Sequence, residues 1–311
     1  MNHEIELPKK VSQWKSQFEA LLTRLLEHDI KPGDIVTIDI SRTVFFASEL
    51  TAILSAIIER WLSDGVHVKL TSTKIEPVDQ MFRRNGFYSS FKNEPIMNDA
   101  YGTYLPLFSE YSQATEAIEK FLNESVFKNE HWPANSSLAS HEMETINSAI
   151  FEIARNINEH SGSNRLFMCG QFYPTIHQLR FTLVDTGSGI ADNVYNQLSE
   201  LKAPKQTKTL LKNASDASRI DWATDRGNST KANIASGMGL YDIKSSLLGH
   251  GEFTIVANSG FWKQTSEGRI IKQKMNVRYH GTILHLLFNI DQNRLAESSV
   301  KDDTMTTEIF F

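Results

Sequence analysis

A long amphipathic segment in the second half of the chain, residues 140–161, places the strongest limit on the fold. Its apolar residues recur every three or four positions and so share one face of a helix: Ile146, Ile150, Ile153 and Ile157. Short apolar and β-branched runs follow it, and we expect these to be strands: 166–172, 179–184, 253–257, 271–278 and 282–290. The first two are close enough for a hairpin. This order predicts an α+β sandwich, a mostly antiparallel sheet with helices on one face.

The first half of the chain alternates helical and strand patterns, which favours an α/β unit with partly parallel strands. The expected elements are helix 11–28, strand 35–40, helix 47–62, strand 66–70 and helix 78–84. The pattern weakens beyond residue 89, where one helix is expected at 110–126. A polar stretch then suggests a boundary. The resulting division is an α/β domain with an N-terminal helix at 1–127, a connector at 128–139, the sandwich at 140–294 and a tail at 295–311.

The composition is typical of a globular protein with a substantial core, with 40% hydrophobic residues, 22% charged residues and a net charge of −5. No run of Lys or Arg forms a basic stripe, so direct nucleic-acid binding is not expected. The N-terminus lacks the apolar core of a signal peptide, and no segment reaches the roughly 20 apolar residues of a membrane helix. We therefore expect a cytoplasmic protein that does not enter a membrane. The single cysteine, Cys169, predicts a buried, inert thiol and excludes an internal disulfide.

A polar ridge runs along the long helix, separate from its apolar face. Glu152, Asn156 and His160 are spaced four residues apart, so their side chains lie one above another. Mg²⁺ prefers oxygen ligands and keeps its waters, so one Asn carboxamide together with substrate phosphates can hold it. A carboxylate one turn away can orient or deprotonate an attacking water or hydroxyl. A solvated helix face shows the same pattern, so the ridge alone does not establish a site.

The first of two glycine-containing segments is Asp185-Thr-Gly-Ser-Gly-Ile190, directly after a strand. Its glycines let the backbone pass close to a flat ligand, and the Asp carboxylate can accept a hydrogen bond from an exocyclic amine. An ordinary tight turn uses the same residue types.

The second segment consists of Arg226-Gly-Asn-Ser-Thr-Lys231 and then Ser236-Gly-Met-Gly-Leu240, which opens a helix. Free N–H groups at a helix N-terminus, together with the helix dipole, favour phosphate. Ser229, Thr230 and Lys231 can add hydroxyl donors and a positive charge. The pattern is neither a P-loop nor a Rossmann fingerprint.

The order and spacing of these elements over residues 140–290 resemble the GHKL ATPases, a superfamily that includes gyrase-type ATPases, Hsp90, MutL, histidine kinases and anti-sigma-factor kinases. The resemblance implies Glu152 as general base and Asn156 as the Mg²⁺ ligand, with residues 191–236 as a mobile lid. It also implies that Asp185 binds the adenine amino group, with Gly189 beneath the base and Thr282 in support. Gly237 and Gly239 would lie along the triphosphate. The residues assigned to Mg-ATP binding are Asn156, Asp185, Gly187, Gly189, Ile190, Ser229, Thr230, Lys231, Gly237, Met238, Gly239, Leu240 and Thr282. The chain departs from the family at Ile234, where a GxxGxG motif would have its first glycine.

The first half resembles a STAS domain, through its strand, the helix that starts near Ser48, the second strand and the helix that ends at Asn85-Gly86. In anti-anti-sigma factors of this family a serine at the start of the helix is phosphorylated by a GHKL kinase. Ser48 falls at that place, but Ala47 replaces the usual Asp. A serine that merely caps the helix is the alternative.

These resemblances favour a slow Mg-ATPase regulator whose lid closure controls engagement of a protein partner. Two alternatives remain: a protein serine/threonine kinase of anti-sigma type acting on a STAS-like partner, and a nucleotide-sensing scaffold without hydrolysis. We expect a STAS-like or other signalling protein as partner, and a homodimer is possible. Resemblance of fold does not choose among these functions.

Overall fold

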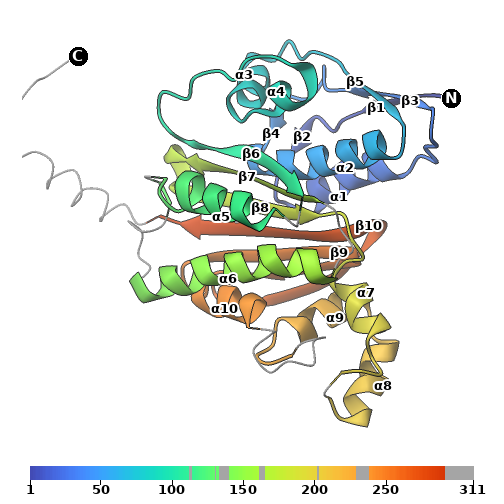
Figure 1. Ribbon diagram of the computed structural model, residues 1–311, viewed down its shortest axis with the longest axis vertical. Coiled ribbons are helices and arrows are strands. Elements are labelled where there is room, and N and C mark those ends of the chain that lie inside the picture. The colour runs from blue at the N-terminus through green and yellow to red at the C-terminus, as the bar shows by residue number, and fades with distance from the viewer. Residues whose placement is uncertain are drawn as a thin grey trace, which may run out of the picture.

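The computed structural model describes residues 1–111, 114–129, 131–132, 140–160, 165–201, 203–228 and 238–290, with the side chains of 144–154 described within 140–160. It is a mixed α/β structure with open sheets, arranged in layers (Figure 1). The mixed character expected from the sequence is confirmed. In the part of the chain that the structure describes, no helix is both long and apolar enough to cross a membrane.

The first unit contains a small parallel sheet covered by helices. Three strands pair in the order β1-β3-β5: β1 (Asn2–Glu6), β3 (Ile35–Asp39) and β5 (His67–Leu70). A second pair, β2 (Lys10–Val11) with β4 (Phe45–Phe46), is also parallel. The helices are α1 (Lys15–Leu26), α2 (Thr51–Ser63), α3 (Glu76–Arg84) and α4 (Phe87–Lys92), and a 3₁₀ turn, η1 (Ser48–Leu50), leads into α2. The predicted alternation and parallel pairing are therefore confirmed, while β1, β2, β4 and α4 were not expected.

The second unit is built on a five-stranded sheet in which every neighbouring pair is antiparallel. The order is β6-β7-β8-β10-β9. The strands are β6 (Tyr104–Tyr111), β7 (Arg165–Tyr173), β8 (Gln178–Asp185), β9 (Gly251–Gln264) and β10 (Ile270–Asn289). A 3₁₀ turn, η4 (Pro174–Ile176), closes the predicted hairpin between β7 and β8. The two last strands expected from the sequence are one strand, β10, with irregular register near Tyr279.

The predicted helix at 110–126 is wrong at its beginning. Residues 104–111 form β6, the edge strand of the large sheet, and the helix α5 (Thr115–Phe121) starts later and continues as a π-helical turn, η2 (Leu122–Val126). Pro106 lies in this strand, at a register shift between Leu105 and Phe108. Proline is tolerated at a sheet edge or bulge because its missing N–H has no partner to lose there.

Helices and the first unit cover opposite faces of the large sheet (Figure 1). On one face α6 (Ser140–His160) and α10 (Gly239–Ser246) bury Ile150 and Ile243 against sheet residues such as Leu183. On the other face α1 and α2 pack against the intervening sheet residues, such as Val184, whose side chains point the opposite way. This alternation follows from the two-residue period of a strand. The sheet is thus buried on both sides, which explains why its central strands are almost continuously apolar.

The region expected to be a polar lid contains three short helices within its described residues. They are α7 (Ile190–Asn196), α8 (Lys205–Asn213) and α9 (Asp216–Ala223). Val194, Leu201 and Leu211 form a small apolar cluster of their own, separate from the main core. In Figure 1, α8 lies at the end of the molecule farthest from the first unit.

Candidate functional site

The carboxyl group of Asp185 is buried at the end of the central strand β8. Its side chain accepts a hydrogen bond from the backbone N–H of Gly187 at 2.7 Å, and Thr282 on β10 also donates to it. Asp185 is 3% exposed. Burial raises the pKa of Asp185 to about 6, although the hydrogen bonds from Gly187 and Thr282 oppose that shift. The site therefore holds a hydrogen-bond acceptor in an apolar setting, where it can select a ligand that donates.

The loop after Asp185 is held to β10 by close backbone contact. Gly189 has φ of +78°, and a Cβ there would lie 2.6 Å from the carbonyl oxygen of Gly281. Gly281 has φ of +136°, and its own Cβ would lie 2.1 Å from the carbonyl oxygen of Asp185. Neither position has room for a side chain. The backbone N–H of Ile190 donates to Thr282 Oγ1 at 3.3 Å. The structure thus brings together Asp185 and the predicted residues Gly187, Gly189, Ile190 and Thr282.

Asn258 fixes this loop to β9, and the sequence analysis did not identify it. Its Nδ2 group donates to the carbonyl oxygen of Ser188 at 3.1 Å and to Asp192 Oδ2 at 2.8 Å. Its Oδ1 atom accepts from the backbone N–H of Asp192 at 3.1 Å. Asn258 is fully buried and has φ of +56°, a conformation in which Asn is enriched. In the sequence, Asn258-Ser-Gly260 interrupts a pattern of strand residues, and this interruption could have pointed to Asn258.

The second part of the site lies where α6 meets the start of α10. A Cβ placed on Gly239 would lie 3.2 Å from Glu152 Oε2 and 3.3 Å from Ile153 Cγ1. The half-buried Glu152 carboxylate therefore rests against the first residue of α10, preceded by Met238 as N-cap. Leu240 packs against the same apolar cluster as Ile153 and Ile190. Both parts of the site thus border one core, on the helical side of the sheet.

Several predicted residues lie outside the described part of the structure. They are the side chain of Asn156 and the whole of Ser229, Thr230, Lys231 and Gly237. Among the residues described, no group of three or more His, Cys, Asp or Glu side chains could hold a metal ion.

Ser48 lies at the beginning of η1, as the STAS resemblance requires, but it is fully buried. Its hydroxyl oxygen accepts from Asn85 Nδ2 at 3.1 Å. The N-cap position is Ala47, and no side chain caps this helix start. The expected capping role is therefore not seen. In this conformation the Ser48 hydroxyl is also not accessible to a kinase.

Comparison with known proteins does not identify a family. No family model matches this chain, and no curated protein matches it. Among solved structures, one match is described as the crystal structure of the N-terminal domain of a DNA repair protein, with 18% identity over 40% of this chain. This chain spans 31% of that one, and the TM-score is 0.19. A score this low carries no argument about fold or function.

Proposed function

We propose that this protein is a Mg-ATP-binding regulator of the GHKL type, a slow ATPase whose lid closure controls engagement of a protein partner. The observation that carries the proposal is the contact between Glu152 and Gly239. It joins a candidate general base to a glycine-initiated helix, and the N–H groups at the start of a helix favour phosphate. The buried carboxyl group of Asp185, bordering the same core, supplies an acceptor suited to an adenine amino group.

The proposed roles follow from the chemistry of each residue. Asp185 would accept from the adenine amino group, and Thr282 would hold that carboxylate in place. Glu152 would accept a proton from the attacking water. Asn156 would contribute an oxygen to Mg²⁺, which neutralises charge on the phosphates when bound.

The connection between the lid and the site supports coupling to a partner surface. Asp192, in the first turn of α7, is tied to Asn258 and also forms an ion pair with Arg278 on β10. Helix α7 therefore starts at the Asp185 loop, while α8 lies at the far end of the molecule (Figure 1). A change in the loop on nucleotide binding would move a surface that a partner can contact.

The test is incubation of the full chain with γ-labelled Mg-ATP, following free phosphate and labelled protein together. The variants are Glu152→Ala and Asn156→Ala, and Glu144→Ala serves as control because Glu144 is an exposed residue of the same helix. Phosphate release that is lost in the first two variants and kept in the control supports the ATPase. Labelled protein would favour a kinase instead. Failure of the wild-type protein to bind Mg-ATP would overturn the proposal.

A further inference from the structure

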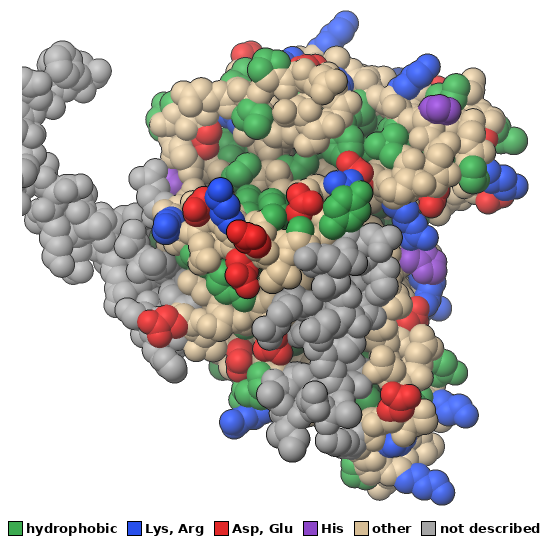
Figure 2. Space-filling view, in the orientation of Figure 1, with side chains coloured by type: hydrophobic (Ala, Val, Ile, Leu, Met, Phe, Trp, Pro, Cys, Tyr) green, Lys and Arg blue, Asp and Glu red, His purple; other side chains and the backbone are tan. Residues whose placement is uncertain are grey.

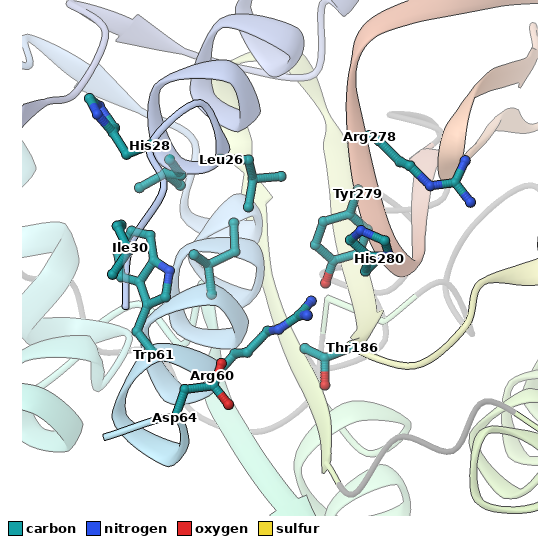
Figure 3. Close-up of a pocket in the computed structure, with 12 residues that line it drawn as sticks. Leu26, His28, Ile30, Arg60, Trp61, Asp64, Thr186, Arg278, Tyr279 and His280 are labelled. Atoms are coloured by element: carbon teal, nitrogen blue, oxygen red, sulfur yellow. The ribbon is translucent and has the colours of Figure 1, made fainter. Parts of the chain in front are cut away.

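A cavity of about 250 Å³ lies between the first unit and the irregular part of β10 (Figure 3). Its apolar wall comes from α1, α2 and the segment after α1. Leu25, Ile57 and Trp61 form its buried base, and the half-buried Leu26 and Ile30 present apolar surface to the cavity. Its other side is formed by Thr186, Tyr279 and His280. None of the residues assigned to Mg-ATP lines it, so this cavity is distinct from the candidate nucleotide site.

Positive charge is concentrated at the mouth of this cavity. Arg60 reaches from α2 toward Tyr279, His280 and Thr186, whereas the guanidinium group of Arg278 is turned outward (Figure 3). Burial, with the charges of Arg60 and Arg278, lowers the pKa of His280. Figure 2 shows Lys, Arg and His side chains gathered at the right-hand edge of the molecule, at the level of the sheet.

The two arginines differ in their partners. Arg278 forms ion pairs with Asp192 and Asp216. Arg60 forms no ion pair with any residue that the structure describes, although Asp64 also lines the cavity mouth. A guanidinium group without an ion-pair partner among the described residues, beside an aromatic and aliphatic wall, is suited to a ligand with a carboxylate or phosphate group. The stem of such a ligand would cover the apolar wall, which gains free energy as area is removed from water.

We infer that this cavity binds a small organic anion, with its carboxylate or phosphate on Arg60 and its apolar body against Leu26, Ile30 and the edge of Trp61. The volume is below the usual range for drug-sized ligands, so the ligand has a single ring or a short aliphatic chain. The inference does not depend on the proposed ATPase, because none of the residues assigned to Mg-ATP lines the cavity, although Thr186 lies in the Asp185 loop.

The test uses the full chain without nucleotide and three fluorinated probes observed by ¹⁹F NMR. The probes are 4-fluorobenzoate, 4-fluorophenyl phosphate and the neutral isostere 4-fluorobenzamide. We expect at least one anion to bind with a Kd of about 1 mM, and the amide to bind at least about fivefold more weakly. The two anions distinguish a carboxylate site from a phosphate site.

Arg60→Gln should weaken binding of the better anion at least about fivefold, since it removes a charge-assisted hydrogen bond. Arg42→Gln is the matched control, because Arg42 is exposed and lies outside the cavity. Leu26→Asp is a second variant for the same binding measurement, because it places a negative charge, which repels an anion, on the half-buried cavity wall. Far-UV circular dichroism and thermal unfolding check that each variant is folded. The inference is overturned if neither anion binds, if the amide binds as tightly as the anions, or if Arg60→Gln behaves like Arg42→Gln.

Discussion

The carboxylate of Glu152 on α6 lies close against the backbone of Gly239, the first residue of α10. A Cβ on Gly239 would lie 3.2 Å from Glu152 Oε2 and 3.3 Å from its Cδ. The start of α10 is also where backbone N–H groups have no partner within the helix. The size of residue 239 therefore controls how closely an acidic side chain approaches a helix N-terminus.

Replacing Gly239 by alanine tests this contact. The added methyl group must displace the Glu152 carboxylate by a few tenths of an ångström, because the neighbouring Ile153 Cγ1 is equally close. The free energy of unfolding should change by less than about 1 kcal/mol, since alanine is the better helix former and offsets the tighter packing. If the proposed ATPase is correct, phosphate release should fall at least about tenfold, because a misplaced base loses alignment. Urea unfolding and a phosphate-release assay measure the two effects.

Ser245→Ala is the control for Gly239→Ala, because Ser245 is an exposed residue of the same helix. It also changes helix propensity, but at a position that is exposed to solvent. Equal phosphate release in both variants would show that the Glu152–Gly239 contact has no role in hydrolysis.

Asp185→Asn should stabilise the nucleotide-free protein at neutral pH. The pKa of Asp185 is raised to about 6 in the folded state, above its ordinary value of 3.8. Between these values the folded state binds more protons than the unfolded state, so stability falls as pH rises through this window. At a pH above both pKa values, the raised pKa of Asp185 costs the folded state about 3 kcal/mol of stability. Asparagine does not ionise, so it avoids this cost. We expect a gain of about 1–3 kcal/mol at pH 7.5, smaller at pH 4, measured by urea unfolding at several pH values.

The same substitution should abolish binding of Mg-ATP, because an amide N–H₂ would face the donor group of adenine. Asp64→Asn, at an exposed position, serves as the control and should change neither stability nor binding. A loss of stability for Asp185→Asn at pH 7.5 would contradict the assignment of a buried carboxylate held at an energetic cost.

Asn258→Ala should release the Asp185 loop from β9. The substitution removes two donated hydrogen bonds and one accepted bond, and it leaves the Asp192 N–H without its acceptor. It also places alanine at φ of +56°. We expect a loss of about 2–4 kcal/mol in the free energy of unfolding. Hydrogen exchange of the Asp192 amide should become faster than that of amides in β8.

The control for Asn258→Ala is Asn289→Ala, at an exposed position whose side chain bonds to Gln178. It should cost less than about 0.5 kcal/mol. Equal costs for the two asparagines would show that burial and loop attachment at Asn258 contribute little.

The periodic parts of the chain were predictable because burial imposes a period on sequence. The stripe of Ile146, Ile150 and Ile153 is buried as expected, and so is Cys169. Strand β1 was missed because Ile5 is its one buried residue, so its pattern is too weak to read. The edge strand β6 was missed, and its last two residues, 110–111, were assigned to a helix, because its pairing with β7 joins residues far apart in sequence, which no local pattern encodes.

The site was predictable only in part, for a different reason. Asp185, Gly187 and Gly189 share a short motif, and Thr282 was assigned through the resemblance, so the grouping of these residues was open to sequence reasoning. The contacts of Asn258 and Tyr279 were not, because each residue reaches the loop from another strand. The Tyr279 hydroxyl, for example, donates to the Asp185 carbonyl oxygen at 2.8 Å. Such supporting residues carry no motif of their own. Their role follows from the register of β9 and β10.

The packing of the first unit on the sheet depends on a buried ionic contact. Glu49 is fully buried beside Arg180 of β8, with Oε1 and Nη1 3.8 Å apart, and the Tyr173 hydroxyl donates to its other oxygen at 2.7 Å. Burial raises the pKa of Glu49 even though Arg180 opposes the shift. Glu49 Oε1 and Arg180 Nε have no hydrogen-bond partner among the described residues. Because these hydrogen bonds only partly offset the cost of burying the two charges, removing either charge should lower the stability of the folded protein.

Arg180→Met should therefore cost about 3–5 kcal/mol at pH 7, because it leaves the Glu49 carboxylate buried without a counter-charge. In a Glu49→Gln background the same substitution should cost less by about 1–3 kcal/mol, since no charge remains to be stranded. The cost of Arg180→Met alone should also shrink as pH falls toward 5. Removing Arg180 raises the pKa of Glu49 further in the folded state, and stability is then lost as pH rises through it. Urea unfolding of both single variants and the double variant at pH 5 and pH 7 measures the coupling. Equal costs of Arg180→Met with and without Glu49 would mean that the guanidinium group acts through its bond to Gln13 and its contact with the Tyr173 ring, and not through the carboxylate.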